Sequence, residues 1–193
     1  MPLNNVGVIV LAGGAASRLG GVNKALCLLN GKPLIEYVLE TFGKAASLVI
    51  SANRDSARLR QYGFAVAADE TPYQHRGPLA GIVSAARLLP PKIEYIQVLP
   101  CDAPYLPECV LIGLHERLAE SSAEIVCAAT PMRMHPIVCQ FRRRHLVVIE
   151  QQLADGGKGS VRSIIEPYAH STVYFADEKW FHNFNRTEDW ING

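Results

Sequence analysis

The first predicted strand leads directly into a glycine-rich loop, and this junction restricts the fold more than any other part of the chain. Residues 6–11 read VGVIVL, a short run rich in β-branched side chains. Such a run is typical of a strand that lies inside a parallel sheet and is covered on both faces. Four glycines then fall within the nine positions 13–21, at 13, 14, 20 and 21. We therefore expect a central parallel strand with a loop at its carboxyl end, where sheets of this kind bind ligands.

Strand-like and helix-like segments alternate along the rest of the chain. The other predicted strands cover 47–51, 64–68, 95–99, 124–130 and 137–141. Apolar residues at helical spacing predict helices around 35–42, 79–86 and 110–118, and less regular sequence predicts short helices at 144–153, 160–166 and 187–191. The pattern predicts an α/β fold: a single-domain, Rossmann-like three-layer sandwich with a mainly parallel central sheet and helices on both faces.

Composition and charge exclude several classes of protein. The chain is 49% hydrophobic, and its 19 Lys and Arg against 18 Asp and Glu are too evenly balanced for bulk binding of nucleic acid. The longest apolar stretch, residues 6–16, is shorter than the ~18 residues of a membrane span and lacks a basic lead, so we expect neither a membrane protein nor a secretion signal. The five cysteines form no CxxC pair, which favours reduced thiols and a cytoplasmic location.

The glycine-rich loop has the composition of a phosphate-binding loop. The first acidic residue of the chain is Glu36, whereas three cations, Arg18, Lys24 and Lys32, come before it. An anion bound at this loop would therefore meet little repulsion. The glycines would let backbone N–H groups approach the ligand, while Arg18 and Lys24 would balance phosphate charge. The spacing matches neither the Walker pattern nor the dinucleotide pattern GxGxxG. The alternative is a glycine-rich turn whose two cations point into water.

This loop and several later motifs resemble one family of nucleotidyltransferases. LAGG followed by AASRLGGVNK matches their pattern of Leu-Ala-(Ala or Gly)-Gly, three variable residues, Arg, a hydrophobe, Gly and then Lys. With NGKPL at 30–34, GPLAG at 77–81 and PCDAPYLP at 100–107, the Gly-Gly form resembles the molybdenum cofactor guanylyltransferases, the MobA family. The likeness extends from Val6 to NFNRTEDW near the C-terminus. It departs at Leu19, where the family often has Met, and at Asn23, where it often has Asp.

The resemblance implies a reaction, a cofactor and a set of site residues. One nucleotidyltransferase domain over residues 1–193 would transfer GMP from GTP to the phosphate of molybdenum-molybdopterin, with Mg²⁺ as cofactor and pyrophosphate as the second product. Arg18, Lys24 and Asp102 would be catalytic. Its partners would be molybdenum-cofactor carrier proteins or recipient molybdoenzymes. We expect it to bind neither nucleic acid nor membranes. GTP would contact Leu11, Ala12, Gly13, Gly14, Arg18, Lys24, Asn53, Asp69 and Asp102.

Three polar residues follow predicted strands and suit distinct tasks. Asp102 offers the hard carboxylate oxygen that Mg²⁺ prefers beside phosphates and water; its alternative is an Asx-turn before Pro104. The resemblance places Asp69 at guanine, where a carboxylate can accept from the ring N–H and the amine together, against the alternative of a solvated turn. It also places a nucleotide-contacting Asn near 51–53, where the alignment is ambiguous by one residue. Ser51 and Asn53 are both eligible, and we favour Asn53.

Further residues are candidates for the acceptor or metal side. Arg76, Pro78 and Leu79 begin a predicted helix whose N-terminal N–H groups suit an anion, although close packing of small residues explains GPLAG equally well. Asn183 and Asn185 lie in a C-terminal segment that the resemblance brings to the site. For Asn185, with Glu188 three positions later, helix capping is the default interpretation.

Two other features have structural interpretations. Cys101 has no neighbouring base in the sequence, so we interpret it as buried packing rather than as a nucleophile. The run Arg142–Arg144 is the densest concentration of charge, and we interpret it as the solvated start of a helix.

Two other functions stay open. The first is a cytidylyltransferase of the same superfamily, with molybdopterin or a sugar or polyol phosphate as acceptor; Gly13 argues against it, since those relatives more often carry Leu-Ala-Ala-Gly. The second is a non-catalytic molybdopterin carrier or chaperone. The presence of Arg18, Lys24 and Asp102 argues against a carrier, because it would need no metal at the α-phosphate.

Overall fold

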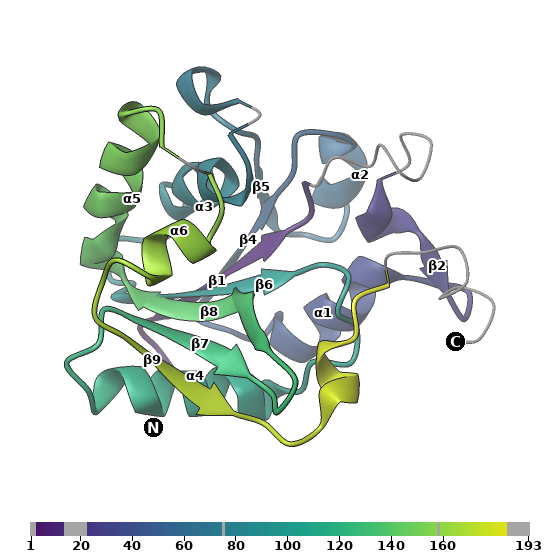
Figure 1. Cartoon of the computed structure of the whole chain (residues 1–193). Helices are drawn as coiled ribbons and strands as arrows, with labels where there is room; N and C mark the ends of the chain where they lie inside the picture. Colours follow the sequence, from purple (N-terminus) through teal and green to yellow (C-terminus); the bar gives the residue numbers. More distant parts are fainter. Residues whose placement is uncertain (1–2, 14–22, 75, 158, 185–193) are drawn as a thin grey trace.

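A mixed sheet forms the centre of the protein (Figure 1). The computed structural model describes residues 3–13, 23–74, 76–157 and 159–184. Six of the sheet's strands run parallel to one another, whereas β8 is antiparallel to both of its neighbours, β6 and β7. The predicted mainly parallel sheet is therefore confirmed. In spatial order the strands are β5 (Ala65–Ala67), β4 (Ser47–Ser51), β1 (Val6–Leu11), β6 (Tyr95–Pro100), β8 (Met134–Arg142), β7 (Ile125–Ala129) and β9 (His170–Tyr174).

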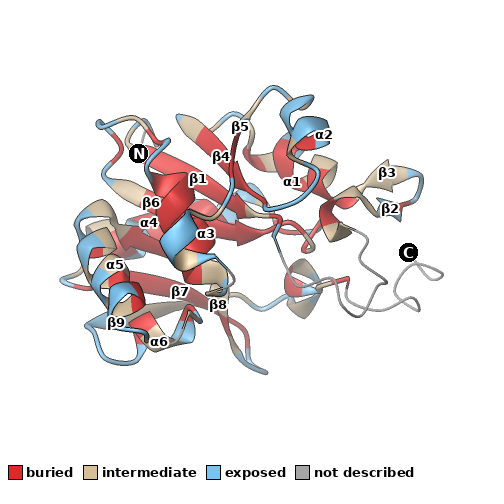
Figure 2. Cartoon of the chain, turned by 90° about the horizontal axis from the view of Figure 1, so that it is seen from above, coloured by how far each residue is buried: buried red, intermediate tan, exposed pale blue. Residues whose placement is uncertain are grey.

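Helices cover both faces of the sheet, as predicted (Figures 1 and 2). In β1, Val8 and Val10 pack into one core and Ile9 into the other, because successive side chains of a strand point to opposite faces. The Val8 face is covered by α1 (Leu34–Phe42), α2 (Ser56–Arg60) and α4 (Glu108–Ala119), and the Ile9 face by α3 (Pro78–Ala86), α5 (Leu146–Ala154) and α6 (Arg162–Ile165). All residues of α3 after Pro78 are buried, which fits a helix that is apolar on all sides. No helix within the described ranges is both long and apolar enough to cross a bilayer.

The structure contains elements that the periodicity did not predict. Strand β9 is only partly buried along its length, so it lacks the continuous apolar run of the central strands. A small hairpin joins β2 (Leu28–Leu29) to β3 (Lys32–Pro33) through Asn30 and Gly31, which both have positive φ, the conformation of a tight Asn-Gly turn. The predicted helix at 187–191 lies outside the described residues. Short 3₁₀ turns complete the chain: η2 (Lys24–Leu26), η3 (Thr71–Tyr73), η4 (Arg143–His145) and η5 (Glu178–Phe181).

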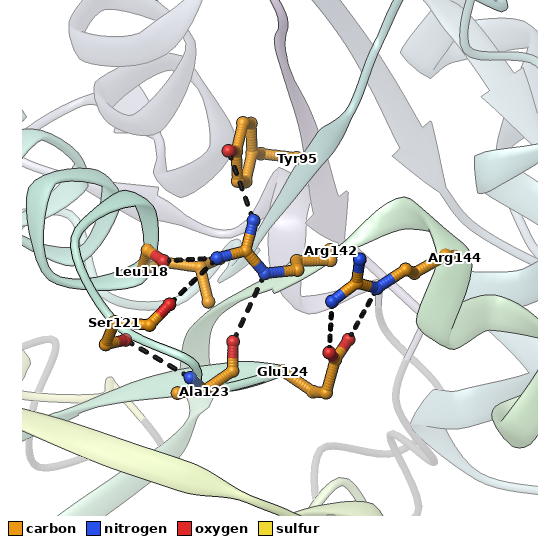
Figure 3. A network of polar contacts seen from close by, with 7 residues as sticks. All are labelled: Tyr95, Leu118, Ser121, Ala123, Glu124, Arg142 and Arg144. Atoms are coloured by element: carbon orange, nitrogen blue, oxygen red, sulfur yellow. Dashed lines mark hydrogen bonds and ion pairs between the residues drawn. The ribbon is translucent and has the colours of Figure 1, made fainter.

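The arginine run at 142–144 is not the solvated helix start that its charge suggested. Arg142 binds the carbonyl oxygens of Leu118 and Ser121 at the end of α4 at 2.8 and 3.0 Å (Figure 3). Arg143 points to the other face and binds carbonyls at the end of α3, including those of Leu89 at 3.2 Å and Ala86 at 3.5 Å. Helix ends carry unpaired carbonyl oxygens and negative partial charge, so both guanidiniums cap helices on opposite sides of the sheet. Only Arg144 is exposed, paired with Glu124.

Candidate active site

The carboxyl ends of four parallel strands bring the predicted nucleotide residues to one edge of the sheet. Backbone hydrogen bonds continue past the strands: the Ala12 N–H donates to the Ser51 carbonyl at 2.8 Å, and the Ala52 N–H to the Ala67 carbonyl at 2.8 Å. The loops after β1, β4, β5 and β6 are thereby held side by side. Leu11, Ala12 and Gly13 begin the glycine-rich loop there, and Gly13 lies against the backbone of Asn53. Gly14 and Arg18 lie outside the described residues.

Lys24 and Asp102, 78 positions apart in the chain, form an ion pair at this edge. Lys24 begins η2, which Asn23 caps by accepting from the Ala25 N–H at 3.1 Å. The Asn23 amide also donates to the Arg54 carbonyl at 3.4 Å, a bond that the more usual Asp could not make. The departure from the family pattern at position 23 therefore preserves the cap and ties the loop to the segment after β4.

The surroundings of Asp102 suit Mg²⁺ bound together with a phosphate ligand. The carboxylate is 14% exposed, and among the described residues no group of three or more His, Cys, Asp or Glu side chains could hold a metal. Mg²⁺ is commonly held by one or two carboxylates, with substrate phosphates and water completing its shell. A lone carboxylate beside a cationic loop therefore fits an ion that arrives with a nucleotide.

Asn53 and Asp69 hold each other by two hydrogen bonds. The Asn53 amide donates to the Asp69 carboxylate at 2.8 Å, and the Asp69 N–H donates to the Asn53 side-chain oxygen at 2.7 Å. Ser51 is 3% exposed and lies beneath Gly81 of α3, where any Cβ would overlap the Ser51 hydroxyl. The geometry therefore favours Asn53 over Ser51 as the accessible polar residue after β4, and it explains why GPLAG needs a glycine at position 81.

The start of α3 is closed by another part of the chain. The Leu79 N–H donates to the Gly159 carbonyl at 3.1 Å, and the Arg76 guanidinium donates to the Gly157 carbonyl at 2.9 Å. The Leu79 side chain is fully buried. The predicted helix start at Pro78 is correct, but Leu79 offers neither a free N–H nor an exposed side chain to an anion. The carbonyl of Gly159 takes the place that we expected a ligand to fill.

The C-terminal segment returns to Asp102 as the resemblance implied. After η5, the Phe184 N–H donates to the Asp102 carbonyl at 3.0 Å, which places Asn183 beside the site; Asn185 lies outside the described residues. Cys101 is 5% exposed, and burial, followed by the charge of Asp102, raises the pKa of its thiol. The thiol stays protonated at neutral pH, which agrees with its interpretation as packing.

Comparison with known proteins identifies the family. The family described as "MobA-like NTP transferase domain" matches residues 8–173. The chain belongs to this family.

Individual relatives agree along almost the whole length of the chain. The molybdenum cofactor guanylyltransferase of Photobacterium profundum is 38% identical, with 94% of this chain and 91% of the relative aligned. That of Haemophilus influenzae is 30% identical over 95% of both chains. The crystal structure of molybdopterin-guanine dinucleotide biosynthesis protein A from Archaeoglobus fulgidus superposes with a TM-score of 0.74 over 96% of this chain and 95% of that one; at 22% identity this likeness concerns the fold.

One part of the site of this MobA-like transferase has no counterpart in the sequence analysis. The turn between β7 and β8 lies at the same edge as Asp102, because β8 is antiparallel and begins where the parallel strands end. The turn carries Arg133, and His135 follows it at the start of β8. Their signal in the sequence is an Arg two positions before a His at the start of a strand, which is too short to separate from a solvated turn.

Proposed function

We propose that this MobA-like transferase transfers GMP from GTP to the phosphate of molybdopterin, with release of pyrophosphate. The observation that carries the proposal is the meeting of Lys24 with Asp102 at the end of β6, on the same edge as the Asn53–Asp69 pair. The curated relatives named above bear the name of this activity, and they align with nearly the whole chain.

The order of the strands sets the direction in which GTP would lie. Asp69 follows β5 and Asp102 follows β6, and these strands are three positions apart in the sheet. Neighbouring strands are about 4.8 Å apart, so the two carboxylates follow strands separated by about 14 Å. Asp69 would accept from the N–H and amine of guanine, held in place by Asn53, while the triphosphate would extend toward Lys24 and Asp102.

The chemistry needs charge neutralisation more than a base. The second pKa of a phosphate monoester is about 6, so the acceptor is mostly ionised at neutral pH and its oxygen can attack without losing a proton to the protein. That oxygen forms a bond to the α-phosphorus of GTP, the bond from the α-phosphorus to the bridging oxygen breaks, and pyrophosphate leaves. Lys24 would move from Asp102 onto the triphosphate. Bound Mg²⁺, held by Asp102, would neutralise charge that develops on the phosphates.

Pyrophosphate release from GTP, molybdopterin and Mg²⁺ tests the proposal. We expect release from the wild-type chain and a loss of at least about 100-fold in Asp102→Asn, since that side chain holds the shape but loses the charge that binds the metal. Asp155→Asn, at the exposed end of α5, is the matched control. A carrier would bind molybdopterin without releasing pyrophosphate. A cytidylyltransferase would release it from CTP in preference to GTP, and either result would overturn the proposal. The cytoplasmic location stays a prediction.

A further inference from the structure

A small pocket lies beside Asp102, on the side away from the nucleotide loops. Its volume is about 130 Å³, and Pro100, Arg133, His135, Phe181 and Asn183 are among the residues that line it. Pro100 ends β6 two positions before Asp102, and Asn183 precedes the residue whose N–H binds the Asp102 carbonyl. The pocket therefore adjoins the candidate metal ligand at two points of the chain.

The order of the sheet places this pocket where a second substrate would have to approach. β6 has β1 on one side and β8 on the other. The loops after β1, β4 and β5 are assigned to GTP. A second substrate would therefore have to reach Asp102 from the other side of β6, where β8 and β7 lie. In a displacement at phosphorus the attacking and leaving oxygens lie roughly in line, on opposite sides of the phosphorus. An acceptor that enters over β8 meets the α-phosphate from the side away from the glycine-rich loop.

Arg133 differs from the arginines at the other end of β8. Arg142 caps a helix and Arg144 pairs with Glu124 (Figure 3), and Arg143 caps a helix on the other face of the sheet. The Arg133 guanidinium forms no ion pair or hydrogen bond with any described residue, and the residue is exposed in the turn that begins β8. Its backbone is nevertheless well fixed, since its carbonyl accepts from the Thr130 N–H at 2.9 Å. The Glu178 carboxylate lies within electrostatic reach of Arg133 but forms no ion pair with it, so the guanidinium keeps its hydrogen-bond donors for an anion.

Several contacts hold the residues that line the pocket beside Arg133. His135 is buried, its Nε2 lies 3.1 Å from the Thr130 hydroxyl, and its ring stacks on Phe181 with centroids 4.4 Å apart. Burial, reinforced by Arg133 and opposed by Glu178, lowers the pKa of His135, so its ring is neutral at neutral pH. Glu178 accepts the Met132 N–H at 3.1 Å, which braces the other side of the turn. The only positive charge that lines the pocket within the described residues is therefore that of Arg133.

We propose that this pocket binds the phosphate end of the acceptor and that Arg133 is the side chain that holds it. The inference rests on the proposed transfer of a nucleotide to a phosphomonoester. An arginine suits this task because its planar fork can donate two hydrogen bonds to one phosphate. The pocket, with a volume of about 130 Å³, is large enough for a phosphate group, and the rest of the acceptor would extend beyond it.

Steady-state kinetics with Arg133 variants test this assignment. We expect Arg133→Ala to raise the KM for molybdopterin by about 10- to 100-fold, the range for loss of a charge-assisted hydrogen bond, with kcat and the affinity for fluorescent GTP close to wild type. Arg133→Lys keeps the charge without the fork and should fall between the two. Arg144→Ala, an exposed arginine at the opposite end of β8, is the control and should leave the KM unchanged.

A binding experiment separates this inference from the proposed activity. Molybdopterin is titrated into each protein without nucleotide, and pterin fluorescence reports binding. Weaker binding of molybdopterin by Arg133→Ala than by wild type supports the assignment of the pocket to the acceptor, even if no pyrophosphate is released and the proposed activity fails. Equal binding by the two proteins, absence of binding to wild type, or an equal loss of GTP affinity in Arg133→Ala would each overturn the assignment.

Discussion

Replacement of Lys24 by methionine should have opposite effects on the affinities for a divalent cation and for GTP. In the structure the Lys24 ammonium pairs with Asp102, the proposed metal ligand. A metal ion that binds without nucleotide must displace that ammonium. Methionine fills similar space but carries no charge, so it leaves the carboxylate available. We therefore expect Lys24→Met to strengthen cation binding in the absence of nucleotide and to weaken GTP binding, since the same ammonium would contact the triphosphate.

The magnitude follows from how far the pair is shielded from water. The two side chains are 21% and 14% exposed, so the pair lies between two limits. Fully exposed pairs are worth at most about 1 kcal/mol, and unit charges 4 Å apart at an effective dielectric of 20 attract by about 4 kcal/mol. An intermediate value of about 1.5 kcal/mol corresponds to roughly a tenfold gain in cation affinity.

Mn²⁺ provides the assay because the free ion is measured directly by electron paramagnetic resonance. Mn²⁺ is titrated into wild type, Lys24→Met and Lys32→Met without nucleotide. Lys32, which precedes α1, pairs with Glu40 in the last turn of that helix, and the control variant has the same net charge as Lys24→Met. Unchanged Mn²⁺ affinity in Lys24→Met, or an equal gain in Lys32→Met, would refute the local competition between the ammonium and the metal.

Three further predictions concern stability. Arg143→Met leaves carbonyls at the end of α3 without their donor, so the free energy of unfolding in urea should fall by about 2–3 kcal/mol. Arg144→Met, which changes an exposed residue, should lower it by less than about 1 kcal/mol, and equal losses would contradict the capping role. Gly81→Ala should reduce the free energy of unfolding by about 1–3 kcal/mol, seen as a lower midpoint of thermal unfolding, because the added Cβ overlaps the Ser51 hydroxyl. Adding Ser51→Ala should restore most of this loss, and no recovery in the double variant would place the strain elsewhere. Burial lowers the pKa of His145 below the unfolded value of about 6.5, so its neutral form stabilises the fold above that pH, and this contribution is lost as the pH falls through the folded pKa. His145→Phe should therefore lose less thermal stability than wild type between pH 7 and 5. The same pH dependence in both proteins would refute the role.

The local sequence pattern was sufficient to predict the central strands and the edge of the sheet that carries the site. β4 begins and ends at the residues predicted for it, and β1 likewise, because both strands are buried on both faces and their interior positions are apolar. The positions of Asn53, Asp69 and Asp102 at strand ends followed from the same boundaries. The edge strand β9 escaped prediction since only part of it is buried, and its sequence is correspondingly mixed.

The sequence by itself therefore determined the central strands, their mainly parallel arrangement, and which polar residues stand at the carboxyl edge of the sheet. Only the tertiary structure decided what those residues contact. It paired Lys24 with Asp102, used Arg142 and Arg143 to cap two helices, closed the start of α3 with Gly159, and left Arg133 beside a pocket. The physical reason is range: side-chain periodicity and turn chemistry act over a few residues, whereas the partner of a charge is set by contacts between segments far apart in the chain.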